Sequence, residues 1–305
     1  MANFGGLLRK MNGSVGDLTF KQVKGQTIVS EKVTQVSNPR TEPMMRQRMK
    51  WTNIGAMFSG IRPLLDNGFE TKEGLQSDYN KFMQINLQKS PVYLTKQQKR
   101  AGACIAAPYQ ITQGSLQPIA ITGEGNTAVT DIFLGGITLS ASTTVGEFSQ
   151  AVISNNPAYR NGDQISYFII RQNVDETSGI PYCTFEGYKV ILDVTSEAKL
   201  WAVVPKNGFF SQDGCIGKYG NDGDCVFAWV HSRKVSGKTR VSTQSLINAN
   251  SKLADYQGDM AFQVASLSYG EVKEVFLTPK GESSSIVSGG GNAGSGGSQG
   301  GGDSL

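Results

Sequence analysis

The chain has 305 residues, of which 38% are hydrophobic, so it can bury a sizeable core in one large domain or two ordinary ones. Apolar runs such as residues 200–204 and 226–230 are far shorter than the ~20 residues that a membrane-spanning helix needs, and we expect no membrane partner. The net charge of +4 is uneven, +9 over residues 1–100 (16 Lys and Arg against 7 Asp and Glu) and −5 over residues 101–305 (13 against 18), so the two halves face different surroundings.

The N-terminal residues predict an intracellular protein that starts with a β-hairpin. Residues 1–13 contain Arg9 and Lys10 but not the apolar stretch of about 7–15 residues found in a secretory signal. Apolar alternation over residues 17–36 is interrupted by a Lys-Gly-Gln turn at residues 24–26, a pattern typical of a hairpin. We therefore expect residence in a cytoplasm and reduced cysteines, since no C-x-x-C pair is present.

A helical hairpin is predicted next. In residues 38–43, Asn-Pro keeps the chain extended and Thr41 can cap a helix with a Pro in its first turn. Pro63 and the Asn-Gly pair at residues 67–68 should end this helix, and a second helix is expected over residues 75–88. The apolar residues of the first helix follow spacings of three, four and seven, which predicts one apolar face: Met44, Trp51, Ile54, Phe58, Ile61 and Leu65.

Beyond Tyr109 the pattern changes to short β-rich runs separated by turn residues, which favours an antiparallel sandwich or barrel. A short helix is expected at residues 145–154, and the Gly-rich residues 289–305 are expected to form a flexible tail. The predicted fold is α+β and mostly β, with residues 1–110 forming the hairpin and two helices and residues 111–288 the β region. The candidate strands are residues 119–121, 132–139, 165–170, 182–194, 200–204, 225–231, 240–246, 262–267 and 272–277.

The sequence offers little chemistry. His231 is the single histidine, so a general base would need a nucleophile and a carboxylate from elsewhere, and a structural or surface role is favoured. The Gly-rich stretch between Cys215 and Cys225 is better explained as a hairpin loop than as a zinc or calcium site, although whether these cysteines ever pair stays open. Residues 236–239 (Ser-Gly-Lys-Thr) are better explained as a strand turn than as a phosphate loop. We expect no enzyme activity, catalytic residue, metal or cofactor.

The candidate interaction residues are a basic cluster, Arg40, Arg46, Arg48 and Lys50. Such a row can follow a phosphate backbone, lie on a solvated helix face, or dock on an acidic neighbouring subunit. The interleaved aromatics of single-strand binders are absent, so docking on a protein is favoured over nucleic acid. The nearby methionines at positions 44, 45, 49 and 57 are more typical of a core than of an adaptable interface.

A family resemblance adds to this interpretation. The Asn-Pro-Arg-Thr-Glu run at residues 38–42, the Arg-Gln-Arg helix at residues 46–48 and residues 61–69 resemble a domain-of-unknown-function family of Bacteroidota and their crAss-like phages. The order of landmarks is similar over residues 5–247, whereas the residues beyond Asn248 depart from the pattern. The resemblance implies a small helical element followed by an immunoglobulin-like β region, an origin in a bacterium or its virus, and no catalytic residue to carry over.

These features together predict a self-assembling virion component, for example a tail-barrel, ring or capsid-associated subunit of a phage. It would assemble in the bacterial cytoplasm with copies of itself and other virion proteins, reaching a neighbour through its N-terminal hairpin or glycine tail. One alternative is a β-sandwich module that binds a host ligand through exposed aromatics such as Tyr159, Trp201 and Tyr219. Another is a nucleic-acid-associated protein that uses residues 9–50. Copy number, position in an assembly and partner identity are not fixed by the sequence.

Overall fold

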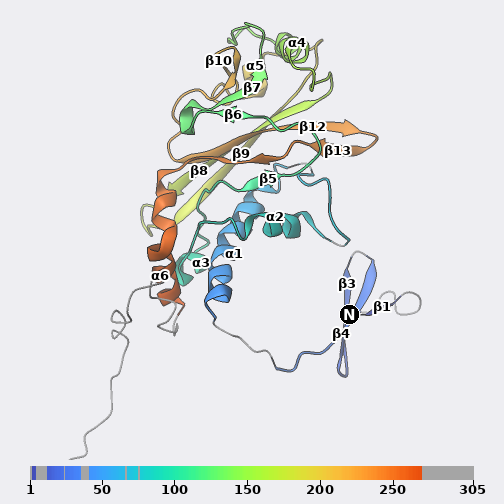
Figure 1. Cartoon of the computed structure of the whole chain (residues 1–305), viewed down its shortest axis with the longest axis vertical. Coiled ribbons are helices and arrows are strands. Elements are labelled where there is room, and N and C mark those ends of the chain that lie inside the picture. Colours follow the sequence, from blue (N-terminus) through green and yellow to red (C-terminus); the bar gives the residue numbers. More distant parts are fainter. Residues whose placement is uncertain are drawn as a thin grey trace, which may run out of the picture.

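The fold combines helices with antiparallel sheets and contains more strand than helix, as a computed structural model shows (Figure 1). The structure describes residues 2–4, 12–23, 25–35, 41–65, 67–74 and 76–269. The last predicted strand (residues 272–277) and the Gly-rich tail therefore lie outside the described residues.

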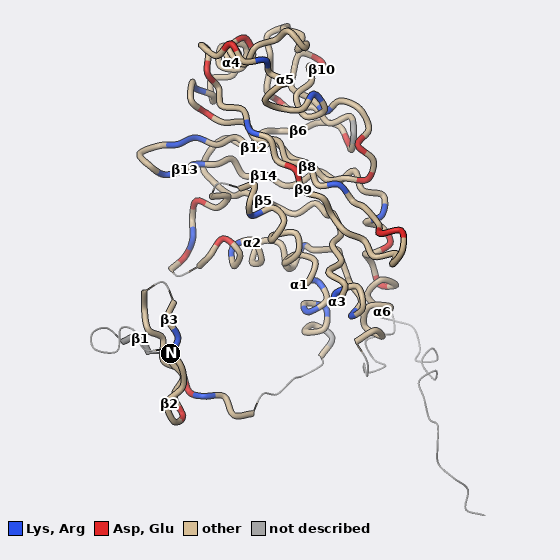
Figure 2. The backbone as a smooth tube through the Cα atoms, turned by 180° about the vertical axis from the view of Figure 1, so that it is seen from behind, with Lys and Arg blue, Asp and Glu red and all other residues tan. Residues whose placement is uncertain are grey.

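The first sheet has four strands in the order β1-β4-β3-β2. The predicted hairpin is confirmed as β3 and β4, in which Phe20 faces Val29 and Gly25 takes a positive φ of 80° in the turn. This N-terminal sheet stands beside the rest of the molecule in views from opposite sides (Figures 1 and 2). Its strands are β1 (Ala2–Phe4), β2 (Gly13–Val15), β3 (Leu18–Val23) and β4 (Gln26–Glu31).

The predicted helix pair is also confirmed, as α1 (Glu42–Ile61) and α2 (Asp78–Asn86), followed by the short α3 (Lys96–Arg100). The expectation that Trp51 belongs to the buried face of α1 is wrong, because its side chain is 47% exposed. At that level α1 faces the polar end of Tyr79, whose hydroxyl accepts the indole N–H of Trp51 at 3.0 Å. An indole with such a partner can stay at the surface.

The main sheet has the strand order β13-β12-β8-β9, in which β12, β8 and β9 are the three long antiparallel strands. Between β12 and β13 the predicted turn is confirmed: Ser236 and Gly237 have φ of 48° and 75°, as a two-residue type I′ turn requires. A short strand also pairs with β12. The strands are β8 (Gln164–Val174), β9 (Pro181–Ile191), β12 (Cys225–Val235), β13 (Lys238–Val241) and β15 (Ile247–Ala249).

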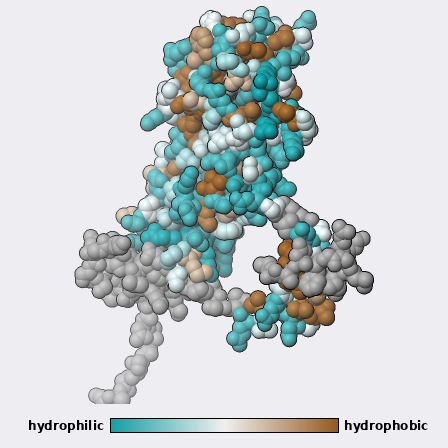
Figure 3. Space-filling model, turned by 45° about the vertical axis from the view of Figure 1, so that its right-hand side comes forward, coloured by the Kyte–Doolittle hydropathy of each residue, from teal (hydrophilic) through white to brown (hydrophobic). Residues whose placement is uncertain are grey.

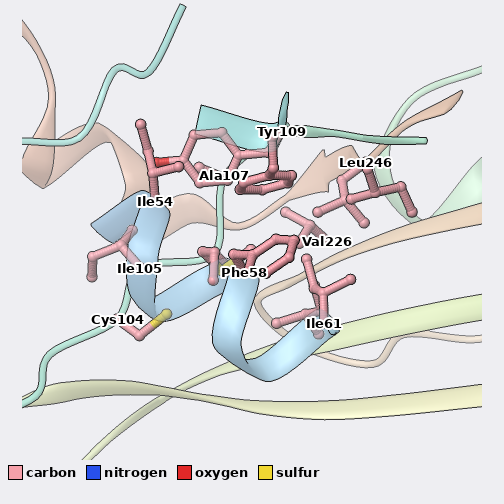
Figure 4. Packing of buried hydrophobic residues seen from close by; sticks show 14 of the residues in the cluster. Ile54, Phe58, Ile61, Cys104, Ile105, Ala107, Tyr109, Val226 and Leu246 are labelled. Carbon is pink, nitrogen blue, oxygen red and sulfur yellow. The ribbon is translucent and has the colours of Figure 1, made fainter. Parts of the chain in front are cut away.

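The main sheet separates two hydrophobic cores. Side chains alternate along β12, so Val226, Ala228 and Val230 pack with the helices on one face. Figure 4 shows this core, where Ile54, Phe58 and Ile61 of α1 lie with Tyr109, Val226 and Leu246. Cys225, Phe227 and Trp229 pack on the other face against a second sheet. Layers of helix, main sheet and second sheet result (Figure 1).

The second sheet has the order β10-β11-β7-β6, and the predicted helix at residues 145–154 is confirmed beside it as α4. Tyr109 is followed by β5, which pairs with β14. These elements are β5 (Gln110–Thr112), β6 (Ile121–Thr122), β7 (Val129–Phe133), β10 (Phe210–Gln212), β11 (Cys215–Gly217), β14 (Gln244–Ser245), α4 (Val145–Asn155) and the 3₁₀ helices η1 (Gly125–Thr127) and η2 (Ser251–Tyr256).

Two predicted strands are helices instead. Residues 200–204 fall in α5 (Leu200–Val203), and residues 262–267 fall in α6 (Gly258–Ser268), which packs on α1. An apolar run of five or six residues has no clear periodicity, so its type depends on what covers it. In α6, Phe262 and Ala265, three residues apart, both face Met45 and Met49 of α1, and this spacing fits a helix.

Two glycines of α1 give a matched test of this packing. A Cβ on Gly60 would lie 2.3 Å from the ring of Phe185, whereas a Cβ on Gly55 would lie 3.7 Å from the nearest atom, the Tyr79 hydroxyl. We predict that Gly60→Ala lowers the free energy of unfolding by about 1–3 kcal/mol through overpacking. Gly55→Ala should raise it by about 0.5–1 kcal/mol, because alanine favours a helix. Urea denaturation measures both, and equal effects at the two positions contradict the predicted packing of α1 on β9.

Candidate interaction site

Three members of the predicted basic cluster, Arg46, Arg48 and Lys50, lie on the N-terminal half of α1, where the positive charges of α1 and α3 gather near α6 (Figure 2). The Arg46 guanidinium lies 3.8 Å from the ring centre of Phe262 in α6 and donates to the Tyr93 hydroxyl at 3.2 Å. The Lys50 ammonium lies 5.4 Å from the Tyr93 ring. Arg46 and Lys50 therefore help to fix α6 and the Tyr93 segment on α1 instead of forming a free row of cations.

The remaining members of the cluster differ from these two. Arg48 is half-buried, and among the described residues it makes no ion pair or ring contact; Arg40 lies outside the described residues. Met45 and Met49, on the inner side of the same helix, are buried with Tyr93, Phe262 and Ala265. The methionines at 45, 49 and 57 are core residues, as the sequence favoured.

Exposed apolar side chains lie on the outward face of α6, close to the basic cluster. Met260, Val264 and Leu267 are all exposed, and their spacing of four and three places them on one side of the helix. Beside them is a groove of about 390 Å³, lined among others by Tyr93 and Tyr256. The sequence pattern does not reveal this surface, because the apolar run at residues 262–267 predicts a strand and the structure has a helix there.

Two of the three aromatics expected at an exposed binding face gather around one lysine. The Lys206 ammonium lies 4.2 Å from the ring centre of Tyr219 and 5.4 Å from that of Trp201. Phe210 completes the group at 5.8 Å. Tyr159 is not exposed: its ring is buried and stacks on His231 with ring centres 4.3 Å apart.

His231 belongs to a buried ionic cluster. Its Nε2 lies 2.9 Å from Oδ2 of Asp163, whose carboxylate also accepts two 2.6 Å hydrogen bonds from Arg233. Burial alone would raise the pKa of Asp163, but the hydrogen bonds from Arg233 and His231 outweigh it and hold the pKa at about 2. Asp163 is thus the carboxylate that a histidine base would need. Arg233 already binds this carboxylate and Tyr159 covers the imidazole, so the cluster joins the start of β8 to β12.

The glycine-rich stretch before Cys225 is a loop, but the hairpin interpretation is wrong. β11 pairs with β7 and β12 pairs with β8, so the loop connects two sheets. The loop packs around Lys218, a buried cation whose ammonium lies 2.6 Å from the Asp222 carboxylate and 3.1 Å from the carbonyl of Gly220. Asp222 also accepts a hydrogen bond from Arg171 at 3.3 Å. In the part of the chain that the structure describes, no three His, Cys, Asp or Glu side chains are grouped to hold a metal ion.

All four cysteines are free thiols. The structure brings together a pair that the sequence did not suggest: the Cys183 thiol donates to the carbonyl of Cys104 at 3.3 Å. The hydrogen bond with Cys183 and burial both raise the pKa of the Cys104 thiol, so Cys104 is poorly ionised and unreactive at neutral pH.

Comparison with known proteins assigns neither a family nor a function to these residues. No family model, curated protein or solved structure matches the chain. Within the described ranges, no helix has the length and apolar character that crossing a membrane requires.

The ionic cluster of Asp163, His231 and Arg233 makes the free energy of unfolding depend on pH. Because the folded pKa of Asp163 (about 2) lies below its ordinary value of 3.8, its ionised form contributes about 2 kcal/mol above pH 4, and this contribution is lost as the pH falls towards 2. We predict that Asp163→Asn lowers the free energy of unfolding by at least that amount at pH 7, and that its difference from the wild type shrinks below pH 4. Urea titrations from pH 7 to pH 3 measure this, with the exposed Glu176→Gln as control. A pH-independent difference contradicts the prediction.

The basic cluster gives a second test. Removing Arg46 deprives Phe262 and Tyr93 of their cationic partner, so we predict that Arg46→Ala lowers the free energy of unfolding by about 1 kcal/mol. Because α6 is held locally by this contact, its amides should exchange hydrogen about fivefold faster in native buffer. Arg48→Ala, with the same change of charge, should leave exchange in α6 unchanged. Equal effects of the two substitutions would show that charge, and not the stacking of Arg46 on Phe262, stabilises the contact between α6 and α1.

Proposed function

We propose that the chain is a non-enzymatic structural subunit that self-assembles in a phage virion, as a tail-barrel or ring subunit or a capsid-associated protein. The observation that carries this proposal is the N-terminal sheet, which stands beside the body in Figures 1 and 2. A subunit that extends a folded sheet beyond its own core has a ready means of holding a neighbour.

The composition of the N-terminal sheet supports this use. Val15 and Leu18 of its strands are 63% and 46% exposed, and Val33, two residues after β4, is 72% exposed. Figure 3 shows hydrophobic surface on the described part of this sheet. Phe20 and Val29 of this sheet are already buried within the chain, but the exposed apolar side chains would be stabilised by a covering layer. In the view of Figures 1 and 2 no helix or strand of the body is stacked on the sheet. The body of another copy would supply that layer.

Charge favours the same partner. Residues 1–40 contain 6 Lys and Arg against 2 Asp and Glu, whereas residues 101–305 carry a net charge of −5. Complementary charges steer two surfaces together and disfavour like pairings. An N-terminal segment of this composition, docked on the acidic β-rich part of the next copy, makes a heterologous contact, which closes into a ring when the rotation allows it.

The virion setting rests on the family resemblance of residues 38–42 and 61–69. With that resemblance we propose assembly in a bacterial cytoplasm, with other virion proteins as further partners. We also propose that the β region is related to the immunoglobulin-like sandwiches, a relation supported by two antiparallel sheets that share the core of Tyr167, Phe209 and Trp229. The hydrogen bond of His231 Nε2 to Asp163 and the stacking of Tyr159 on the imidazole support a structural role for this histidine.

Light scattering coupled to size-exclusion chromatography tests self-assembly. We expect the full chain to elute as a discrete oligomer, and the triple variant Val15→Glu, Leu18→Glu, Val33→Glu to elute at a lower mass, because buried carboxylates oppose docking. The matched control is Val174→Glu with Val235→Glu, two exposed valines of the main sheet, which should keep the wild-type mass. A wild type that stays monomeric at high concentration contradicts the proposal and favours a binding module centred on Lys206 and its aromatic rings.

A further inference from the structure

Helix α6 is apolar on two faces. Among its residues 258–268, Asp259 is the one charged side chain. Phe262 and Ala265 face α1, while Met260, Val264 and Leu267 point outward and are 79%, 55% and 58% exposed. A helix that is apolar all round is normally buried, so the outward face has the character of a contact surface.

The two ends of this face carry opposite charges. The exposed carboxylates of Asp255 and Asp259 lie at the N-terminal end. The C-terminal end lies against α3, where the backbone N–H of Lys96 donates to the Ser268 hydroxyl at 2.8 Å, and α3 also carries Lys99 and Arg100. Lys252 and Arg46 are cations near the acidic end, but the 4.0 Å separation of Arg46 from Asp259, whose side chain is 76% exposed, leaves that carboxylate open to a stronger partner.

We propose that α6 is the contact between two copies of this chain, packed antiparallel across a two-fold axis that passes near Val264. An antiparallel pair places the acidic end of each helix against the basic α3 of the other, whereas a parallel pair would place like charges together. It also places Met260 of one copy against Leu267 of the other, with Val264 facing Val264. The same patch then serves both partners, as an isologous contact requires.

The groove beside α6 gives such a pair room to interlock. It has a volume of about 390 Å³ and is lined by Tyr93, Gln98, Tyr256, Met260 and Val264 among others. Side chains of the second α6 can enter it, so the half-buried ring of Tyr256 is also covered. This contact uses residues remote from the N-terminal sheet and does not depend on its docking.

Cysteine crosslinking in the full chain tests the geometry. A two-fold axis at residue 264 brings both Cβ atoms within reach of a disulfide, about 4 Å. The two copies of residue 260 are then about 12 Å apart along the helix axes, at a rise of 1.5 Å per residue. Under mild oxidation we expect Val264→Cys to give a covalent dimer, Met260→Cys little, and the double variant Met260→Cys, Leu267→Cys a dimer again. The wild type, with its half-buried Cys183 and Cys215, is the background control.

Association is measured independently by sedimentation. Val264→Glu places two like charges at the two-fold axis and should weaken association at this contact about 100-fold. Val174→Glu should leave the association constant unchanged. A photo-crosslinker at position 264, in mixed ¹⁴N- and ¹⁵N-labelled protein, identifies what covers the face. Crosslinks between copies at α6 support the proposal. Crosslinks to residues 270–305 or to the N-terminal sheet, or none at all with unchanged mass for Val264→Glu, overturn it, and the triple variant of the N-terminal sheet reports on the other contact separately.

Discussion

Strand β12 is the element on which both hydrophobic cores depend, because its side chains are buried on both faces. Trp229 is fully buried, and its indole N–H donates to the carbonyl of Gly208 at 2.7 Å. Gly208 can approach so closely because it has no side chain: a Cβ there would lie 2.3 Å from the Tyr167 ring of β8. The second sheet is thus held against β8 and β12 by a contact that combines an aromatic cluster with one backbone hydrogen bond.

The helical side of β12 depends on buried amides as well as on apolar contacts. Residues 103–107 are buried without regular secondary structure, so their backbone groups need partners. Asn53 of α1 accepts from the N–H of Ile105 at 2.7 Å and donates to its carbonyl at 2.9 Å, and Gln172 of β8 accepts from the N–H of Ala106 at 2.8 Å. These side chains connect α1 to the main sheet, and α1 in turn positions α6 and the basic cluster. The α6 surface proposed for pairing therefore depends on the same core as the rest of the fold.

The sequence predicted the elements whose signals are local. The apolar spacing and the proline in the first turn were sufficient for α1, and a two-residue Ser-Gly turn for the pair β12 and β13. Thr41 stands at the N-cap position of α1, but its side chain makes no capping hydrogen bond. It did not predict α6, because its short apolar run becomes helical through contacts with Met45 and Met49, more than 200 residues away. The same distance hid the role of Arg46, whose partners Tyr93 and Phe262 come from later segments. Likewise, nothing around Tyr159 indicated that it would be buried on His231.

The two proposed contacts differ in symmetry, and together they restrict the assembly. Docking of the N-terminal sheet on another copy joins different surfaces, so repetition produces a ring or a filament, whereas α6 against α6 joins identical surfaces and stops at two copies. A ring whose subunits all expose α6 towards one end could thus pair with a second ring, facing it, to give dihedral symmetry. The charge distribution agrees with this division of roles. Residues 1–40 are basic against an acidic β region, while the apolar face of α6 is bordered by carboxylates at one end and by the cations of α3 at the other and is complementary to itself.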